Sequence, residues 1–186
     1  MTDTARPMRA DAARNRARLL AVAYETFAAE GLAVPIDEIA RRAGVGPGTI
    51  YRHFPTKEAL FAAVIDDRVR NVVGTGKALL AADPGTALFE FLREMVRTAA
   101  ADHGLADALV GYGMDIDAAA PGAEAAFVGM LDELLTAAQR AGTVRPDVGP
   151  AELKALMMVC KTTQGCGDGV ADRVASVVVD GLRASS

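Results

Sequence analysis

Residues 36–54, IDEIARRAGVGPGTIYRHF, are the part of the chain that decides its fold. Gly44 interrupts a helical pattern, and Ala40 stands four residues before it. A small residue at 40 lets a second helix cross the first, and glycine supplies the positive φ that ends a helix sharply. Pro47 then opens another short helix at its first position. The segment therefore predicts a helix-turn-helix.

The second helix of this motif is predicted over residues 47–53 and carries polar side chains suited to nucleic acid. Hydroxyl, phenol and imidazole groups hydrogen-bond phosphate or sugar oxygens, and a guanidinium pairs with phosphate or reads guanine bidentately. A helix of this length spans about 10 Å, enough to reach base edges in a major groove. The polar residues expected on one exposed face are Thr49, Tyr51, Arg52, His53 and Lys57. Lys57 begins the next helix, where free N–H groups and a cation favour a phosphate.

Residues that typically begin or end helices recur along the rest of the chain, and the alternation of apolar and polar residues typical of strands is absent. Asp11 is a plausible N-cap for the first helix, and the pair Gly74 and Gly76 indicates a possible bend. The predicted helices span 12–30, 35–43, 47–54, from 57 onward, 86–102, 105–116, 124–141, 151–164 and 170–183. The fold class is therefore all-α, with about nine helices and no sheet.

The composition excludes several classes of protein. The chain has 186 residues and is 51% hydrophobic with 38 alanines, so it is not a disordered chain. Its longest unbroken apolar run has seven residues, too few to span a bilayer, and its N-terminus lacks the apolar stretch of a secretory signal. Two cysteines do not make a disulfide scaffold, so a cytoplasmic location is expected.

Charge divides the chain into two parts. Residues 1–70 hold 11 Lys+Arg and 9 Asp+Glu, a balance of +2, whereas residues 71–186 hold 9 and 15, a balance of −6. Such uneven halves indicate different roles. The predicted organisation is a flexible N-terminal tail at 1–11, a helix-turn-helix DNA-binding domain at 12–70 and a second helical domain at 71–186.

Thirteen positions of the first domain agree in type and spacing with a known family. They are Ile39, Ala40, Gly44, Val45, Thr49, Ile50, Tyr51, His53, Phe54, Lys57, Glu58, Leu60 and Phe61. This pattern resembles the DNA-binding domain of the tetracycline-repressor (TetR) family of bacterial transcription regulators. The resemblance implies a helical homodimer that binds a palindromic operator, with residues 71–186 as a domain that binds a small-molecule effector and forms the dimer. It also implies DNA contacts from Pro47, Gly48, Thr49, Tyr51, Arg52 and His53, and a phosphate contact from Lys57.

Two departures from the family pattern affect the expected contacts. The family usually has Ser or Thr just before its second helix, where this chain has Val34-Pro35. We therefore expect that phosphate contact to be missing or supplied by backbone N–H groups. Pro47-Gly48 offers little side chain, so base reading there is expected to rest on apolar contact and shape, with Arg52 the main candidate for direct recognition.

For the C-terminal half, the sequence predicts the arrangement of helices more clearly than the ligand that they bind. In the family the last two helices pair with their copies, and the candidates for that interface are Leu153, Leu156, Cys160, Val174, Val177 and Val178. Candidates to line an effector pocket, each equally suited to ordinary core packing, are Phe91, Met95, Tyr112, Met114, Phe127, Met130 and Met157. An apolar effector is expected because no charged residue is stranded on an apolar face. Cys160 and Cys166 lack a partner at zinc spacing, so no metal or other cofactor is predicted, and a redox thiol stays an alternative.

Two other functions fit the sequence less well. A helical enzyme would need a Ser-His-Asp set, a metal cluster or a phosphate loop, and none is present. A helix-turn-helix used as a protein-interaction module would share the fold but would not bind duplex DNA in a salt-dependent manner. A regulator is the main prediction, with the effector changing the separation of the two recognition helices.

Overall fold

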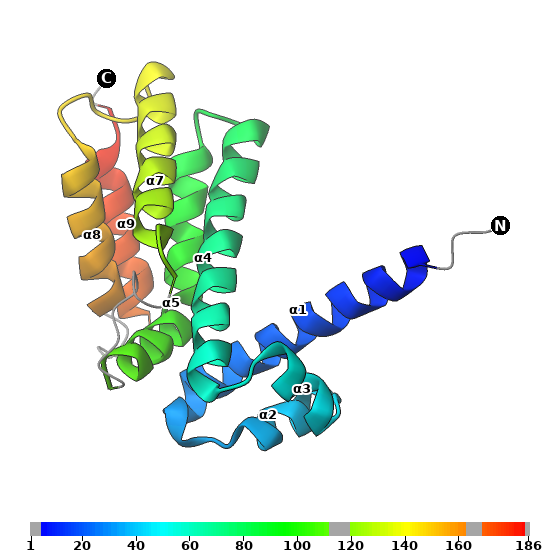
Figure 1. The fold of residues 1–186 in the computed structure, drawn as a ribbon. Helices are drawn as coiled ribbons and strands as arrows, with labels where there is room; N and C mark the ends of the chain where they lie inside the picture. The colour runs from blue at the N-terminus through cyan, green and yellow to red at the C-terminus, as the bar shows by residue number, and fades with distance from the viewer. Residues whose placement is uncertain (1–4, 112–119, 163–168, 185–186) are drawn as a thin grey trace. The chain divides into compact units, whose positions relative to one another are not determined.

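The computed structural model describes residues 5–111, 120–162 and 169–184 (Figure 1). These residues form eight α-helices and one turn of 3-10 helix, and none of them forms a strand, although a single bridge pairs Val144 with Arg183. The all-helical prediction is confirmed. The described ranges hold eight helices rather than nine because two predicted helices are one, α5 (Ala87–Gly111).

The chain forms two compact units that share two of their helices. The N-terminal unit takes residues 1–68 and 104–120, and the C-terminal unit takes residues 69–103 and 121–186. Both α4 (Lys57–Ala82) and α5 contribute residues to each unit. The first unit ends inside α4 at Arg68 and resumes inside α5 at Gly104, a return of which sequence patterns carry no sign.

The N-terminal unit is built around aromatic and aliphatic side chains of α1 (Ala5–Glu30) and the start of α4. Phe27 and Phe61 meet edge to face, with ring centroids 5.4 Å apart and an interplanar angle of 82°, an arrangement that aromatic pairs prefer. A 3-10 turn, η1 (Gly31–Ala33), connects α1 toward α2 (Ile36–Ala43), which packs on α1, and α3 (Pro47–His53) packs on α2. The fully buried side chains here are Leu19, Leu20, Phe27, Ile39, Ile50, Leu60 and Phe61.

The first helix begins earlier than the sequence predicted. It starts at Ala5 rather than at residue 12, so Asp11 lies inside α1 and is not its N-cap. Alanine, arginine and methionine are good helix formers. Pro7 falls in the first turn, where its missing N–H would have had no partner in any case.

The predicted bend in α4 is absent. The helix runs through Gly74 and Gly76 without a break. At Gly76 the glycine makes room for a neighbour, since an added Cβ would lie 2.2 Å from the sulfur of Met130 on α7 (Ala123–Arg140). Close helix packing, rather than a turn, therefore explains this glycine.

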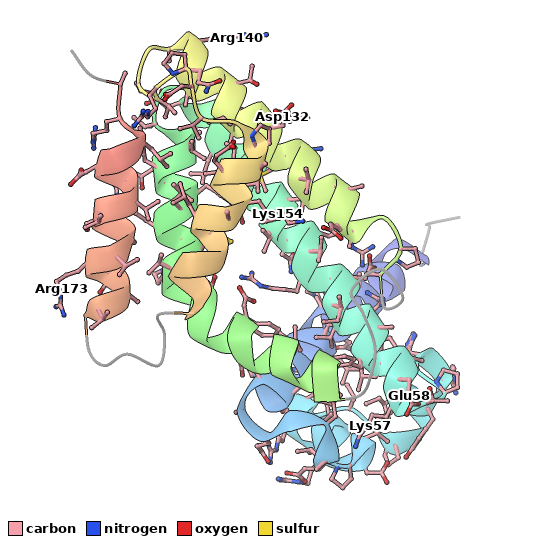
Figure 2. The ribbon with its side chains drawn as sticks, turned by 90° about the vertical axis from the view of Figure 1, so that its left-hand side faces the viewer. Lys57, Glu58, Asp132, Arg140, Lys154 and Arg173 are labelled. Carbon is pink, nitrogen blue, oxygen red and sulfur yellow. The ribbon has the colours of Figure 1, made fainter. Side chains whose placement is uncertain are left out.

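The C-terminal unit surrounds a core formed by α5, α7 and α8 (Pro150–Thr162), joined by α9 (Val170–Leu182). The side chains of Leu88, Phe91 and Leu134 have no exposed surface. Figure 2 shows Lys154 on α8, and its ammonium pairs with Glu124 of α7 at 2.5 Å. The loop after α7 is tied to the chain end, because Ala184 N donates to the carbonyl of Thr143 at 3.1 Å.

Candidate nucleic-acid interface

The turn between α2 and α3 has the geometry expected of a helix-turn-helix. Gly44 adopts φ 67° and ψ 31°, the left-handed conformation, which ends α2 without a Cβ clash. Val45 N donates to the carbonyl of Ala40 at 3.0 Å, which closes the helix end. Ala40 itself is 1% exposed, so the predicted need for a small residue there is confirmed.

The recognition helix α3 is attached to the protein by one buried side chain. Ile50 has no exposed surface and is the one residue of α3 that is buried. Pro47 occupies the start of the helix, and Phe54 closes it, with Phe54 N donating to the carbonyl of Ile50 at 2.8 Å. Because Ile50 alone points inward, the other side chains of α3 are displayed to solvent.

The side chains predicted to meet DNA therefore share one short exposed helix. Pro47, Gly48, Thr49, Arg52 and His53 are all exposed, as is Tyr51, at 43%. Partial desolvation raises the pKa of the Tyr51 phenol, and the nearby Asp37 carboxylate raises it further. The single O–H of the phenol faces the Asp37 carboxylate in this structure, so a hydrogen bond from Tyr51 to DNA would replace that contact.

Lys57 is held more firmly than the sequence indicated. Thr56 caps α4, since Ala59 N donates to its Oγ1 at 3.1 Å. The half-buried Lys57 side chain crosses to the 3-10 turn, where Nζ donates to the carbonyl of Leu32 at 2.5 Å. An ammonium has three donors. The bond to Leu32 therefore fixes the charge beside the first turn of α4 and leaves two donors for another oxygen.

The start of α2 differs from the family pattern as the sequence indicated. Pro35 stands at the N-cap position without a side-chain cap, and Val34 before it is buried. Asp37 and Glu38 lie in the first turn. Two carboxylates at a helix N-terminus satisfy its positive end and repel a phosphate. This end of α2 is therefore a poor site for a phosphate contact.

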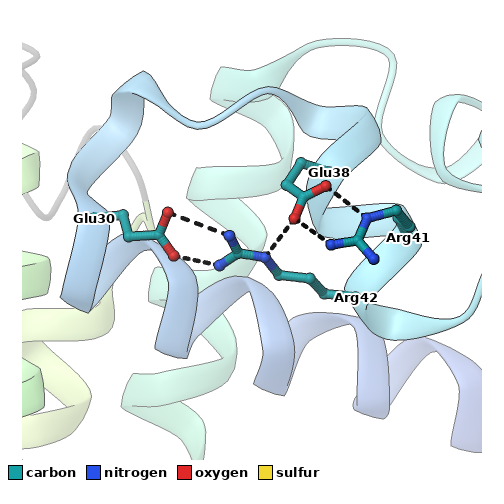
Figure 3. Close-up of polar contacts among 4 residues, drawn as sticks. All are labelled: Glu30, Glu38, Arg41 and Arg42. Atoms are coloured by element: carbon teal, nitrogen blue, oxygen red, sulfur yellow. Dashed lines mark hydrogen bonds and ion pairs between the residues drawn. The ribbon is translucent and has the colours of Figure 1, made fainter.

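Two arginines of α2 are paired with carboxylates in an exposed network (Figure 3). Glu38 accepts hydrogen bonds from Arg41 Nη2 at 2.7 Å and from Arg42 Nε at 2.8 Å. Arg42 also pairs with Glu30 at the end of α1. The hydrogen bonds from Arg41 and then Arg42 lower the pKa of Glu38 from 4.5 to about 2. The positive charges of the two guanidiniums are therefore balanced by carboxylates of the same protein chain.

Glu38→Gln is expected to flatten the acid dependence of stability. A lowered pKa in the folded state contributes stability that is complete above pH 4.5 and is lost as the pH falls toward 2. The thermal midpoint should therefore fall less between these two pH values in the variant than in the wild type. Circular dichroism melts across this range measure the difference. Glu133→Gln, at an exposed position without an ion pair among the described side chains, is the control, and an equal flattening there would contradict the account.

The C-terminal unit contains a small apolar pocket between α5, α8 and α9. Its lining is formed by Leu92, Met95, Val96, Ala99, Met157, Ala175 and Val178. Met95 and Met157 were predicted pocket residues. The other residues on α5 were not, although positions 92, 95, 96 and 99 follow the helical spacing that would have grouped them.

The remaining predicted pocket residues lie elsewhere. Phe91 is buried in the core and stacks on half-buried Phe127, with centroids 6.5 Å apart. Met130 is buried against Gly76. Tyr112 and Met114 lie outside the described residues.

The predicted dimer residues differ in what they expose. Val177 on α9 is 71% exposed, and Val174 and Val178 beside it are half-buried, as is Leu156 on α8. Leu153 has no exposed surface and packs within the subunit core, so it offers nothing to a partner. Nothing is described for the side chain of Cys160, and Cys166 lies outside the described residues.

A displayed recognition helix in one unit and an apolar pocket in the other define a helix-turn-helix transcriptional regulator. Comparison with known proteins identifies the family of regulators. The model of bacterial regulatory proteins of the tetR family matches residues 19–64, and the model of SbtR-like transcriptional regulator C-terminal domains matches residues 83–184. The chain belongs to the TetR family. No helix in the described ranges combines the length and apolarity needed to cross a membrane.

Solved structures and curated relatives agree with this assignment. A TetR transcription regulatory protein from Mycobacterium vanbaalenii is 65% identical over 95% of this chain and 99% of its own, with a TM-score of 0.84. A TetR transcriptional regulator from Streptomyces coelicolor is 34% identical over 92% and 99%, with a TM-score of 0.80. HTH-type transcriptional regulators from Staphylococcus aureus are 42% identical over 59 residues, and this match spans only 32% of their length.

Proposed function

We propose that the chain is a dimeric repressor that binds a palindromic operator in the cytoplasm and is released by a small apolar effector. The observation that carries the proposal is the recognition helix α3, in which Ile50 is buried and all the other residues are exposed. One such helix spans about 10 Å and makes few contacts. A two-fold pair places two of them in successive turns of the major groove, about 34–36 Å apart.

Arg52 is the residue to which we assign direct base reading. Its side chain is exposed near the end of α3 and has no carboxylate partner among the described side chains. A guanidinium in the major groove pairs bidentately with guanine O6 and N7. Thr49, Tyr51 and His53 supply hydrogen bonds to phosphate or sugar oxygens, while Pro47-Gly48 contributes apolar contact and shape.

The dimer interface is proposed for α9, with help from α8. Val177 supports this because a valine that is 71% exposed loses apolar surface to water when a partner covers it. Val174, Val178 and Leu156 extend the apolar surface on these two helices. Two-fold pairing of one patch with its copy is the commonest arrangement of oligomers.

The pocket between α5, α8 and α9 is proposed to hold the effector. Its lining is apolar throughout, which favours an uncharged, apolar molecule because a buried charge without a partner is costly. The pocket-lining helix α5 also contributes residues to the N-terminal unit. An effector weakens operator binding only as far as it prefers the conformation that binds DNA poorly.

Arg52→Ala and Lys57→Met are expected to weaken DNA binding in different ways. Loss of Arg52 should cost about 1–3 kcal/mol per half-site and relax the preference at one base pair. Loss of the Lys57 charge should weaken binding to all duplexes and lower the salt slope by about 0.9 for each phosphate contact, hence about 1.8 in a dimer. Fluorescence anisotropy with operator and scrambled duplexes at several salt concentrations separates the two.

The same experiment separates a regulator from a protein-interaction module. A regulator binds duplex DNA with a steep salt dependence. Wild-type protein that binds no duplex at low salt would contradict the proposed function. An Arg52→Ala variant that keeps the full preference for the operator would contradict the role assigned to Arg52.

A further inference from the structure

The arginines of the N-terminal unit fall into two groups. Arg41 and Arg42 on α2 are paired with Glu38 and Glu30, so their charge is balanced locally. Among the side chains that the structure describes, no carboxylate pairs with Arg16, Arg18 or Arg52. Arg52 belongs to the recognition helix. The other two lie on α1, outside the helix-turn-helix.

Arg18 lies beside the turn that leads into the recognition helix. Its Nη2 is 3.3 Å from the point that a Cβ on Gly44 would occupy. Gly44 begins the turn between α2 and α3, and the Arg18 side chain is exposed. The guanidinium therefore stands at the end of α2, beside the turn that leads into the recognition helix, in contact with solvent.

Arg16 lies beside the other end of the same helix. Its guanidinium carbon is 5.7 Å from the centroid of the Phe54 ring, within range for a cation–π contact. Phe54 directly follows His53 and ends α3. Residues two apart on a helix point in different directions. Arg16 and Arg18 can therefore serve opposite ends of the recognition helix from one segment of α1.

We propose that Arg16 and Arg18 bind two backbone phosphates of duplex DNA on either side of the groove that receives α3. A helix that lies in the major groove, about 12 Å wide, is bordered by phosphates on both sides, so cations that flank α3 are placed to reach them. This inference rests on the proposed function. It adds a sequence-independent contribution to binding, which fixes the position of α3 without reading bases.

A structural role for these arginines makes a different prediction. Arg18 near the end of α2 could act only on the helix dipole, and Arg16 could act only on the Phe54 ring. Either role changes stability and leaves the salt dependence of DNA binding unaltered. The salt slope is therefore the deciding measurement.

The experiment compares full-length Arg16→Gln, Arg18→Gln and Arg41→Gln proteins with the wild type. Glutamine keeps a polar chain of similar shape, and Arg41→Gln removes a charge of the same sign that is already paired with Glu38. Anisotropy titrations use a duplex selected from a random pool and a scrambled duplex, each at several potassium chloride concentrations. Thermal melts establish that each variant is folded.

Each α1 variant is expected to lose affinity for both duplexes by the same factor. The slope of log K against log salt should fall by about 0.9 per phosphate contact, hence about 1.8 in a dimer, while Arg41→Gln keeps the wild-type slope. Arg16→Lys and Arg18→Lys, which keep the charge, should keep the slope. Unchanged slopes in folded Arg16→Gln and Arg18→Gln, or an equal loss in Arg41→Gln, would overturn the inference. Absence of any salt-dependent binding by the wild type would instead overturn the proposed function.

Discussion

Ile50→Ala is expected to lower the free energy of unfolding by about 2–5 kcal/mol and to remove operator binding. Ile50 has no exposed surface and is the one buried side chain of α3. Truncation leaves a cavity beneath the helix and loses the apolar burial that fixes its orientation. Urea denaturation measures the first effect, and an operator titration at a temperature where the variant is folded measures the second.

Thr49→Ala, one residue earlier on the exposed side of α3, is the matched control. Its free energy of unfolding should change by no more than about 0.5 kcal/mol, as for other surface substitutions. If Ile50→Ala were as stable as Thr49→Ala and bound the operator normally, α3 would not depend on this anchor. The account of the recognition helix would then be wrong.

Gly104→Ala is expected to destabilise the N-terminal unit by about 1–3 kcal/mol, the range seen when atoms are forced into packed space. An added Cβ would lie 2.2 Å from the carbonyl oxygen of Ala28 on α1. A backbone carbonyl cannot move aside as a side chain does, so α5 and α1 must separate. Equilibrium unfolding in urea measures the loss.

Two other glycine-to-alanine variants show whether contact, rather than helix propensity, causes that effect. Gly129 on α7 has nothing within 4 Å of an added Cβ, so Gly129→Ala should be neutral or stabilise by up to about 1 kcal/mol. Gly76→Ala meets the flexible side chain of Met130 and should cost less than Gly104→Ala. Equal stability of Gly104→Ala and Gly129→Ala would contradict the close approach.

The helix-turn-helix could be predicted from sequence because its causes are local. Gly44 must have a positive φ, Ala40 must be small, and Ile50 must face inward, and the structure shows all three. Each requirement depends only on residues of the motif itself, which are close together in the sequence. The exposed set on α3 follows as well, since a helix anchored at one position displays the others.

The errors of prediction come from contacts between residues distant in sequence. The sequence predicts a bend at Gly76 and a break between helices at 103–104, yet α4 and α5 continue through both because other helices pack closely there. The bond from Lys57 to the carbonyl of Leu32 joins residues 25 apart. The ion pair of Arg42 with Glu30 spans 12 positions. No local pattern encodes such partners.

Contacts between distant residues also explain why the sequence predicts only some of the residues that line the pocket. Large and soft side chains were the natural candidates, and Met95 and Met157 do line it. Small residues such as Ala99 and Ala175 line it too, because a cavity forms where helices lack bulk. Which helices meet is decided by packing of α5, α8 and α9, so the pocket emerges only from the folded unit.

Selection of bound duplexes from a random pool by the wild-type protein tests the central claim most directly. That claim is that two copies of α3 read adjacent turns of the major groove. The account predicts an inverted repeat whose half-sites are centred about 34–36 Å apart, or a multiple of that distance, with a guanine in each half-site whose enrichment disappears in Arg52→Ala. Recovery of an asymmetric site, or of no enriched sequence at all, would contradict it.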